Sequence, residues 1–210
     1  MRFDLSLYVI TDRTLARGRP LEDIVAAAIR GGATMVQLRE KEQPARQIVE
    51  MGRRLLAITR PAGVPLIVND RVDVAMAIDA DGVHVGQDDL PVADARRLMG
   101  PERIVGASAG TVGEAVAAEA DGADYVGVGS VFATTTKPDA GEAIGPEAIA
   151  EIKAAVRIPI VAIGGISAAN AAEVIHAGAQ GVAVVSALMG ADDVREAARR
   201  LAEVVRAARR

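Results

Sequence analysis

Residues 158–191 read IPIVAIGGISAANAAEVIHAGAQGVAVVSALMGA and decide the fold. The stretch carries one formal charge, at Glu173, so its length and apolar character invite comparison with a membrane-spanning helix. Glycines and polar side chains interrupt it too often for that, since a spanning helix needs about 20 predominantly apolar residues. The stretch instead predicts two buried strands, 160–163 and 181–185, separated by turns and a short helix that contains His176.

The same alternation of strand and helix extends outward over the whole chain. Segments rich in Ala, Glu and Arg separate the strands and carry apolar residues at helical spacing, as at Leu21, Ile24 and Ala28. Such alternation is typical of a parallel sheet covered by helices. Eight units of about 26 residues favour a single-domain, closed (β/α)8 TIM barrel over residues 1–210, rather than an open doubly wound sheet. The predicted strands are 7–11, 35–39, 66–69, 82–85, 104–108, 125–128, 160–163 and 181–185.

The composition excludes several classes of protein. The 210 residues include two Phe, two Tyr and no Trp, and the formal net charge is −4. The chain offers little aromatic surface on which nucleic-acid bases could stack, and no excess of basic residues that could bind a phosphate backbone. We therefore expect no nucleic-acid partner. Without cysteine there is no disulfide framework and no thiolate nucleophile. The first apolar run is too short for a signal peptide, so we expect a cytoplasmic protein without a membrane partner.

Polar residues follow nearly every predicted strand, at the end of the barrel where this fold places its chemistry. Arg39 and Lys41 follow the second strand, and Lys137 lies in the aperiodic loop 132–145 after the sixth. A planar guanidinium and compact ammonium groups together suit a polyphosphate. The alternative is that residues 39–42 form a solvated run of charge. A loop of this length is usually functional, and we expect it to order over the mouth when substrates bind.

Two carboxylates end neighbouring strands. Asp70 follows the third strand and Asp89 the fourth, with Asp88 adjacent to it and able to take the same role. Mg²⁺ is often held by one or two carboxylates together with substrate phosphates and water. The alternative is that Asp70 and Asp89 each cap the helix that follows. The residues alone leave both interpretations open.

The loops after the last two strands suit an anion. Gly164 and Gly165 follow the seventh strand and Ser186 the eighth, where barrels of this class frequently bind a phosphate through backbone N–H groups. The alternative is a pair of tight turns that need glycine for conformation only.

The chain has two histidines, and neither is favoured as a catalytic base. His84 lies between two valines of the fourth strand, and we expect it to be packed or to act through a neighbour. His176 lies near the end of a helix, where a histidine is common for electrostatic reasons. The residues alone give no Ser-His-Asp triad and no His-rich metal site.

In order along the chain, eight motifs resemble the thiamine-phosphate synthase family. They cover nearly the whole chain, and QLREK together with the TTTK loop is far more specific than any of the glycine motifs. The motifs are LYVITD (7–12), QLREK (37–41), VND (68–70), HVGQDD (84–89), GASAGT (106–111), GVGSVFATTTK (127–137), AIGGI (162–166) and GVAVVSAL (181–188).

The resemblance implies a reaction between two small molecules, 4-amino-2-methyl-5-hydroxymethylpyrimidine diphosphate and a thiazole phosphate, to give thiamine phosphate and diphosphate. It implies Mg²⁺ bound by Asp70 and Asp89. It also implies catalytic roles for Arg39, Lys41, Ser108 and Lys137. The residues implied to contact the pyrimidine diphosphate are Gln37, Arg39, Lys41, Asn69, Ser108 and Lys137, and those implied to meet the thiazole phosphate are Thr134, Thr136, Gly165, Val185 and Ser186.

Two positions depart from the family pattern. Ala133 stands where the family often has Pro, and Gly110 where it often has His. Two other functions stay open at this point: a paralogous thiazole tautomerase, which needs a positioned base but no diphosphate clamp, and a non-catalytic ligand-binding barrel. The sequence also leaves open the preferred form of the thiazole and whether the chain forms a homo-oligomer.

Overall fold

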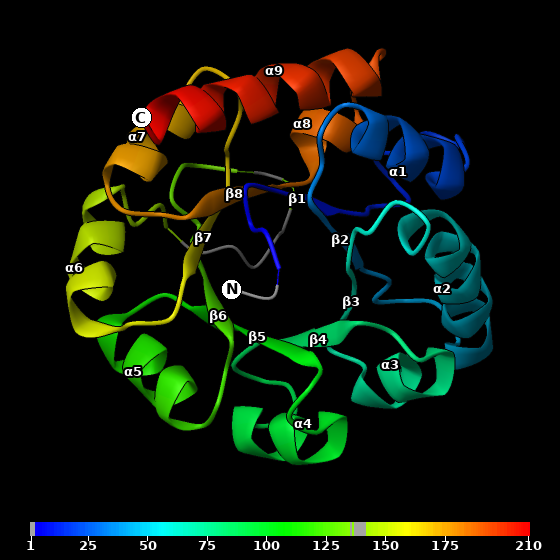
Figure 1. The fold of residues 1–210 in the computed structure, drawn as a ribbon, viewed down its shortest axis with the longest axis horizontal. Helices are drawn as coiled ribbons and strands as arrows, with labels where there is room; N and C mark the ends of the chain where they lie inside the picture. The colour runs from blue at the N-terminus through cyan, green and yellow to red at the C-terminus, as the bar shows by residue number, and fades with distance from the viewer. Residues whose placement is uncertain (1–2, 135, 137–141) are drawn as a thin grey trace.

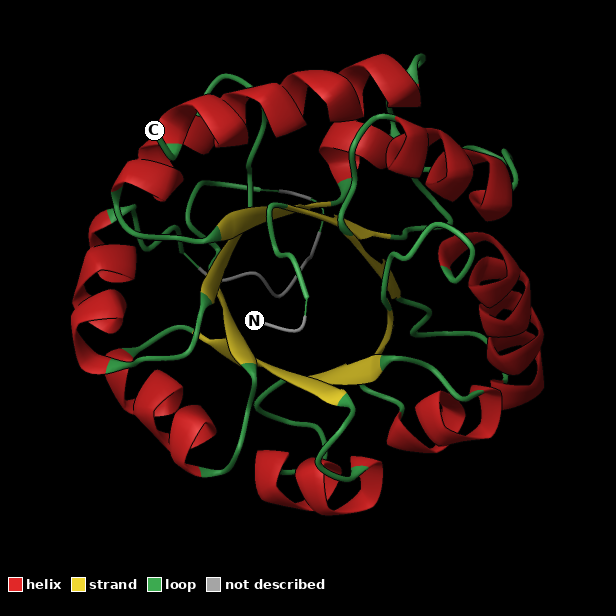
Figure 2. Ribbon diagram, viewed as in Figure 1, coloured by secondary structure: helices red, strands yellow, loops and turns green. Residues whose placement is uncertain are grey.

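Eight parallel strands close into a barrel in the order β1 to β8, as the sequence predicts. The computed structural model describes residues 3–134, 136 and 142–210. Figures 1 and 2 show the strands as an inner ring with the helices around it. The strands are β1 (Leu7–Ile10), β2 (Met35–Leu38), β3 (Leu66–Asn69), β4 (Gly82–Val85), β5 (Ile104–Ala109), β6 (Tyr125–Val128), β7 (Ile160–Ile163) and β8 (Gly181–Val184). The helices are α1 (Leu21–Arg30), α2 (Ala45–Thr59), α3 (Val72–Ile78), α4 (Val92–Met99), α5 (Val112–Ala120), α6 (Glu147–Ala155), α7 (Ala171–His176), α8 (Ser186–Met189) and α9 (Val194–Ala208).

The predicted strand boundaries are right to within one residue. The ranges of β3, β4, β6 and β7 coincide with the prediction, and the other four differ by one residue at the carboxyl end. No sequence pattern separates α8 from α9, because a helix of four residues shows no periodicity. Among the described residues, no helix combines the length and the apolar character needed to cross a membrane.

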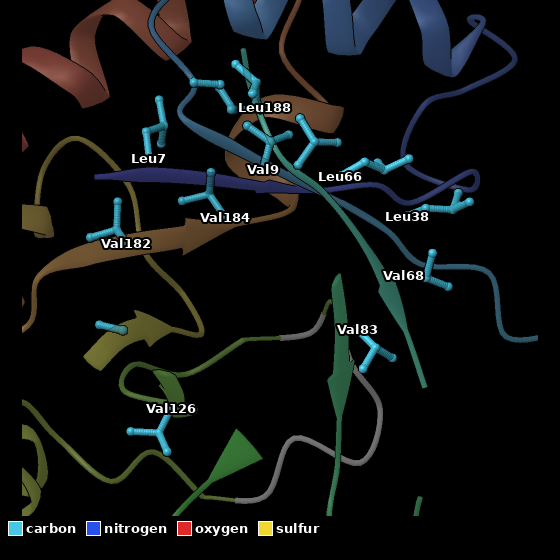
Figure 3. Packing of buried hydrophobic residues seen from close by; sticks show 14 of the residues in the cluster. Leu7, Val9, Leu38, Leu66, Val68, Val83, Val126, Val182, Val184 and Leu188 are labelled. Carbon is cyan, nitrogen blue, oxygen red and sulfur yellow. The ribbon is translucent and has the colours of Figure 1, made fainter. Parts of the chain in front are cut away.

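Side chains of each strand alternate between two cores, because successive residues of a strand point to opposite faces. On β1, Leu7 and Val9 belong to the larger core between barrel and helices, whereas Tyr8 and Ile10 point into the barrel. Figure 3 shows the larger core, where valines and leucines of the strands meet the surrounding helices. Inward-facing residues near the carboxyl ends of the strands therefore share one space.

The amino-terminal end of the barrel interior is filled. The inner core contains Leu5 and Tyr125, and the ring of Phe3 packs edge-on against Tyr125 at a centroid separation of 5.9 Å. Figure 1 shows the N-terminal segment crossing the barrel axis. A Cβ at Gly106 would lie 2.1 Å from the ring of Tyr125, so the absent side chain makes room for this ring. The barrel interior is therefore left open to a ligand toward the carboxyl ends of the strands.

We expect Gly181→Ala to destabilise the protein, because a Cβ there would lie 1.7 Å from the backbone oxygen of Leu5. The expected loss in the free energy of unfolding, measured with urea, is roughly 3 kcal/mol. Gly113→Ala is the matched control. Gly113 lies in α5 with nothing within 4 Å of its would-be Cβ, so alanine should be neutral or stabilising by about 0.5 kcal/mol. Equal stability of the two variants would contradict the packing argument.

Candidate active site

A cavity of about 270 Å³ opens at the carboxyl ends of the strands. Twelve of the thirteen residues that the family resemblance implies at the site line it, and they come from distant parts of the chain. They are Gln37, Arg39, Lys41, Asn69, Asp70, Asp89, Ser108, Thr134, Thr136, Gly165, Val185 and Ser186. Lys137 lies outside the described residues. The barrel thus brings together residues that the sequence spreads over 150 positions, from Gln37 to Ser186.

Residues 39–42 are a solvated run of charge only in part, because Lys41 and Glu42 are exposed whereas Arg39 and Glu40 are half-buried. Arg39 and Lys41 line the cavity, whereas Glu40 pairs with Arg13, with Nη2 and Oε1 2.9 Å apart. The backbone N–H of Arg39 donates to the buried Thr11 hydroxyl over 3.0 Å. This bond ties the segment after β2 to the end of β1. The two cations are therefore directed toward the cavity while the intervening anion is held by a separate partner.

Asp70 and Asp89 form a pair of carboxyl groups that contact each other. Burial, a hydrogen bond with Asp89 and the Asp89 charge raise the pKa of Asp70 to about 6, against the opposing charges of Lys41 and Arg39. The Lys41 Nζ lies 3.7 Å from Asp70 Oδ2. Burial and a close like charge favour a proton on one carboxyl of the pair, whereas a cation beside the pair favours its loss.

Helix capping does not explain these two carboxylates. The N-cap residues of α3 and α4 are Arg71 and Pro91, and neither helix start has a side-chain cap. Asp89 instead accepts from the backbone N–H of Gly86 over 2.7 Å, within its own loop. Asp70 has a left-handed backbone, with φ of 62°, which presents its side chain at the cavity.

The donor set fits Mg²⁺. Across residues 3–134, 136 and 142–210, no three His, Cys, Asp or Glu side chains converge on one point. Mg²⁺ needs no such cage, since it commonly takes one or two carboxylates and completes its shell with phosphate oxygens and water. Asp70 and Asp89, hard oxygen donors in contact and open to the cavity, meet that requirement.

The glycine turn after β7 is required by the backbone and also lines the cavity. Gly164 and Gly165 have φ of 98° and 64°, a region that favours glycine. A Cβ at Gly165 would lie 2.7 Å from the backbone oxygen of Ala133 and 2.8 Å from Cβ of Phe132. The tight-turn and ligand interpretations are therefore compatible, because the turn lets the loop after β6 approach the cavity.

Arg19 holds the short helix α8, which begins with Ser186 at the cavity. Its guanidinium donates to the backbone oxygen of Ala191 over 2.7 Å, to that of Met189, and to that of Ala16 over 3.1 Å. Carbonyl groups at a helix end have no partner within the helix, so an arginine that binds them stabilises the helix. No sequence pattern indicates this role, because Arg19 follows no motif.

The sequence patterns also do not predict a buried chain of hydrogen-bonded polar groups at the base of the cavity. Nδ1 of His84 lies 3.0 Å from the hydroxyl of Tyr125, and its Nε2 lies 3.0 Å from that of Ser108. The Tyr125 hydroxyl contacts that of Tyr8 at 2.9 Å. His84 is packed, as expected, and also lines the cavity; His176 ends α7, as expected. Alternation along β1 and β6 could have revealed the two tyrosines, since both take inward positions.

A family model described as thiamine monophosphate synthase matches residues 7–188. The chain belongs to this family. A thiamine-phosphate synthase of Moorella thermoacetica is 60% identical over 203 residues, which cover 97% of each chain. One of Methanoculleus marisnigri is 52% identical over 97% of this chain and 96% of its own. The solved thiamine phosphate pyrophosphorylase of Pyrococcus furiosus superposes with a TM-score of 0.91 at 47% identity, over 99% of this chain and 98% of that one.

We expect Arg19→Gln to loosen α8 without unfolding the barrel. Loss of the bonds to Met189 and Ala191 should speed amide hydrogen exchange in residues 186–191 by about tenfold, the effect of roughly 1.4 kcal/mol. Arg97→Gln is the control, because Arg97 forms an exposed ion pair with Asp94 on α4, away from α8. Unchanged exchange in residues 186–191 would show that Arg19 does not hold this helix.

Proposed function

We propose that this protein, as one catalytic domain spanning residues 1–210, joins 4-amino-2-methyl-5-hydroxymethylpyrimidine diphosphate to a thiazole phosphate, giving thiamine phosphate and diphosphate. One observation carries the proposal: a single cavity is lined by two cations, a carboxylate pair and the glycine turn after β7. Family membership supports the same reaction. Its partners are then small molecules, and we place it in the cytoplasm.

The first step breaks the bond between the pyrimidine methylene carbon and the diphosphate oxygen. The oxygen keeps the electron pair, and the carbon becomes a cation that the electron-rich aminopyrimidine stabilises. The protein has to stabilise a departing polyanion, and fixed charges in a site of low dielectric do this well. We assign this work to Arg39 and Lys41, which line the cavity, together with Lys137, Asn69 and Ser108. No protein nucleophile is needed.

The second step forms the carbon–nitrogen bond of the product. The lone pair of the thiazole nitrogen attacks the methylene cation, and the positive charge ends on the thiazolium ring. The protein contributes by holding the two reactants in contact. We assign the thiazole phosphate to Gly165, Val185 and Ser186, with Thr134 and Thr136 beside the ring. Gln37 lies on β2, which β1 separates from β8, and we assign it to the pyrimidine.

Asp70 and Asp89 would hold Mg²⁺ at the diphosphate end of the cavity. The ion would supply positive charge to the leaving diphosphate. Lys41 Nζ lies 3.7 Å from Asp70 Oδ2, so a cation lies beside the carboxylate pair. Negative and positive groups side by side suit a ligand that arrives as a metal–diphosphate complex.

A tautomerase needs a base at the thiazole, and the loop after β5 does not supply one. Gly110 occupies the position at which the family often has His, and its backbone N–H donates to Glu114 Oε2 over 2.6 Å. His84 has both ring nitrogens within 3.0 Å of hydroxyl groups. The carboxylate pair beside the two cations suits a diphosphate bound with Mg²⁺, and a reaction of the thiazole phosphate alone involves no diphosphate.

We expect Asp70→Asn to lower Mg²⁺-dependent turnover by about a hundredfold or more, because the charge that binds the ion is lost while the shape is kept. Binding of Mg²⁺, followed by calorimetry in the presence of diphosphate, should weaken in parallel. Asp121→Asn is the control, because Asp121 is exposed at the end of α5 and is not among the described residues that line the cavity. Full turnover of the wild type in excess chelator would remove the metal from the mechanism.

Release of diphosphate should require both substrates. Purified protein with Mg²⁺ and the pyrimidine diphosphate alone should release little diphosphate, and addition of thiazole phosphate should give thiamine phosphate in equal amount. The thiazole alone should not tautomerise measurably faster than in buffer. Rapid tautomerisation without thiamine phosphate would replace the proposed function by the paralogous one.

A further inference from the structure

Five side chains form an unbroken chain of hydrogen bonds across the barrel interior. Nε2 of Gln37 donates to the Tyr8 hydroxyl over 2.8 Å, and the chain continues through Tyr125 and His84 to the hydroxyl of Ser108. The five residues come from β2, β1, β6, β4 and β5. Four of the five, Gln37, Tyr8, His84 and Ser108, line the cavity.

The chain is closely built into the barrel. Gln37 is 2% exposed and Tyr125 is fully buried, so water cannot readily substitute for the protein partners. Two glycines make room for it: a Cβ at Gly106 would overlap the ring of Tyr125, and one at Gly127 would lie 3.2 Å from Cε1 of His84. Tyr125 does not itself line the cavity in the described part of the chain, so any effect of it on a ligand is indirect.

Each hydroxyl in the middle of the chain has one proton and two neighbours. Burial raises the pKa of both phenols, so Tyr8 and Tyr125 stay protonated. An amide nitrogen can only donate, which makes the Tyr8 oxygen an acceptor from Gln37. The Tyr8 proton then goes to Tyr125, and the Tyr125 proton to Nδ1 of His84. A neutral imidazole therefore has its proton on Nε2 and donates it to Ser108.

We propose that Tyr8, Tyr125 and His84 are positioning residues that fix the hydrogen-bond polarity of Gln37 and Ser108, so that the cavity selects an aminopyrimidine over its oxo counterpart. The amide nitrogen of Gln37 faces Tyr8, so its carbonyl oxygen is the acceptor left for the ligand. The Ser108 hydroxyl accepts from His84 and keeps its own proton for the ligand. This inference rests on the proposed function, whose pyrimidine carries an amino group.

The selectivity follows from the direction of the chain. An exocyclic amino group donates to the Gln37 oxygen, whereas an oxo group at the same position would set two acceptors against each other. If the chain is broken, the amide of Gln37 is free to rotate and present its nitrogen to an oxo group. The discrimination should then fall even though every residue that touches the ligand is unchanged.

The test compares kcat/KM for the aminopyrimidine diphosphate with kcat/KM for its 4-oxo analogue. We expect the wild type to prefer the amino compound by about a hundredfold or more, and Tyr125→Phe to lower this preference about tenfold. The phenyl ring keeps the contacts with Phe3 and Tyr8. Thr59→Val is the control for loss of a buried hydroxyl: Thr59 Oγ1 has no hydrogen-bond partner among the described residues, and its removal should leave the preference unchanged.

A spectroscopic measurement tests the direction of the chain without turnover. With ¹⁵N-labelled histidine, the imidazole shifts of His84 should report a neutral ring protonated on Nε2, and Tyr125→Phe should abolish this fixed state. His176→Gln assigns the signals, because the chain has two histidines. A proton on Nδ1, a doubly protonated ring or an unchanged spectrum in Tyr125→Phe would overturn the proposal.

The remaining outcomes are also decisive. If Tyr125→Phe fails to fold, Tyr8→Phe breaks the same chain at the neighbouring residue and should give the same loss of preference. If both fold, the double variant should lose little more than either alone, since both break one chain. An unchanged preference in both variants overturns the proposal. A wild type that makes no thiamine phosphate refutes the proposed function, and the ¹⁵N spectrum then decides the chain by itself.

Discussion

Closure of a parallel sheet on itself is the constraint on which the rest of the structure depends. Closure divides every strand into residues that face the helices and residues that face the axis. The outward set is almost wholly apolar, which attaches the ring of helices to the barrel. The polarity of the residues that face the axis changes from one end of the barrel to the other. Toward the amino-terminal end these residues are apolar, with Leu5 and Met35, and toward the carboxyl end they become polar, with Gln37, Asn69 and Ser108.

This division explains why the fold and much of the candidate site could be predicted from sequence. Strands such as Ile160–Ile163 are short apolar runs bounded by turns, so their positions were correct. Residues such as Arg39 and Asp89 could be gathered at one mouth because parallel strands in a barrel end at the same side. This prediction rests on the topology of the barrel alone and requires no distances between residues.

What could not be predicted depends on contacts between residues far apart in the chain. No local sequence pattern indicates that Asp70 lies beside Asp89, that Glu40 pairs with Arg13, or that Arg19 binds the end of α8. The tyrosines are a similar case. Tyr8 and Tyr125 are 117 positions apart, and no pattern in either strand indicates that their hydroxyl groups are in contact. Sequence patterns place a residue on a face, whereas the partner across the barrel is fixed by closure and register.

The fit between Gly106 and Tyr125 has a consequence for how such a barrel can change over time. The ring occupies the volume that any side chain at position 106 would need. If position 106 becomes even alanine, the aromatic ring at position 125 no longer fits. If the ring at 125 is lost instead, it leaves a cavity that favours a larger residue at 106. The two positions, on adjacent strands, are therefore expected to drift together, and an ancestor that changed one without the other would have passed through a less stable protein.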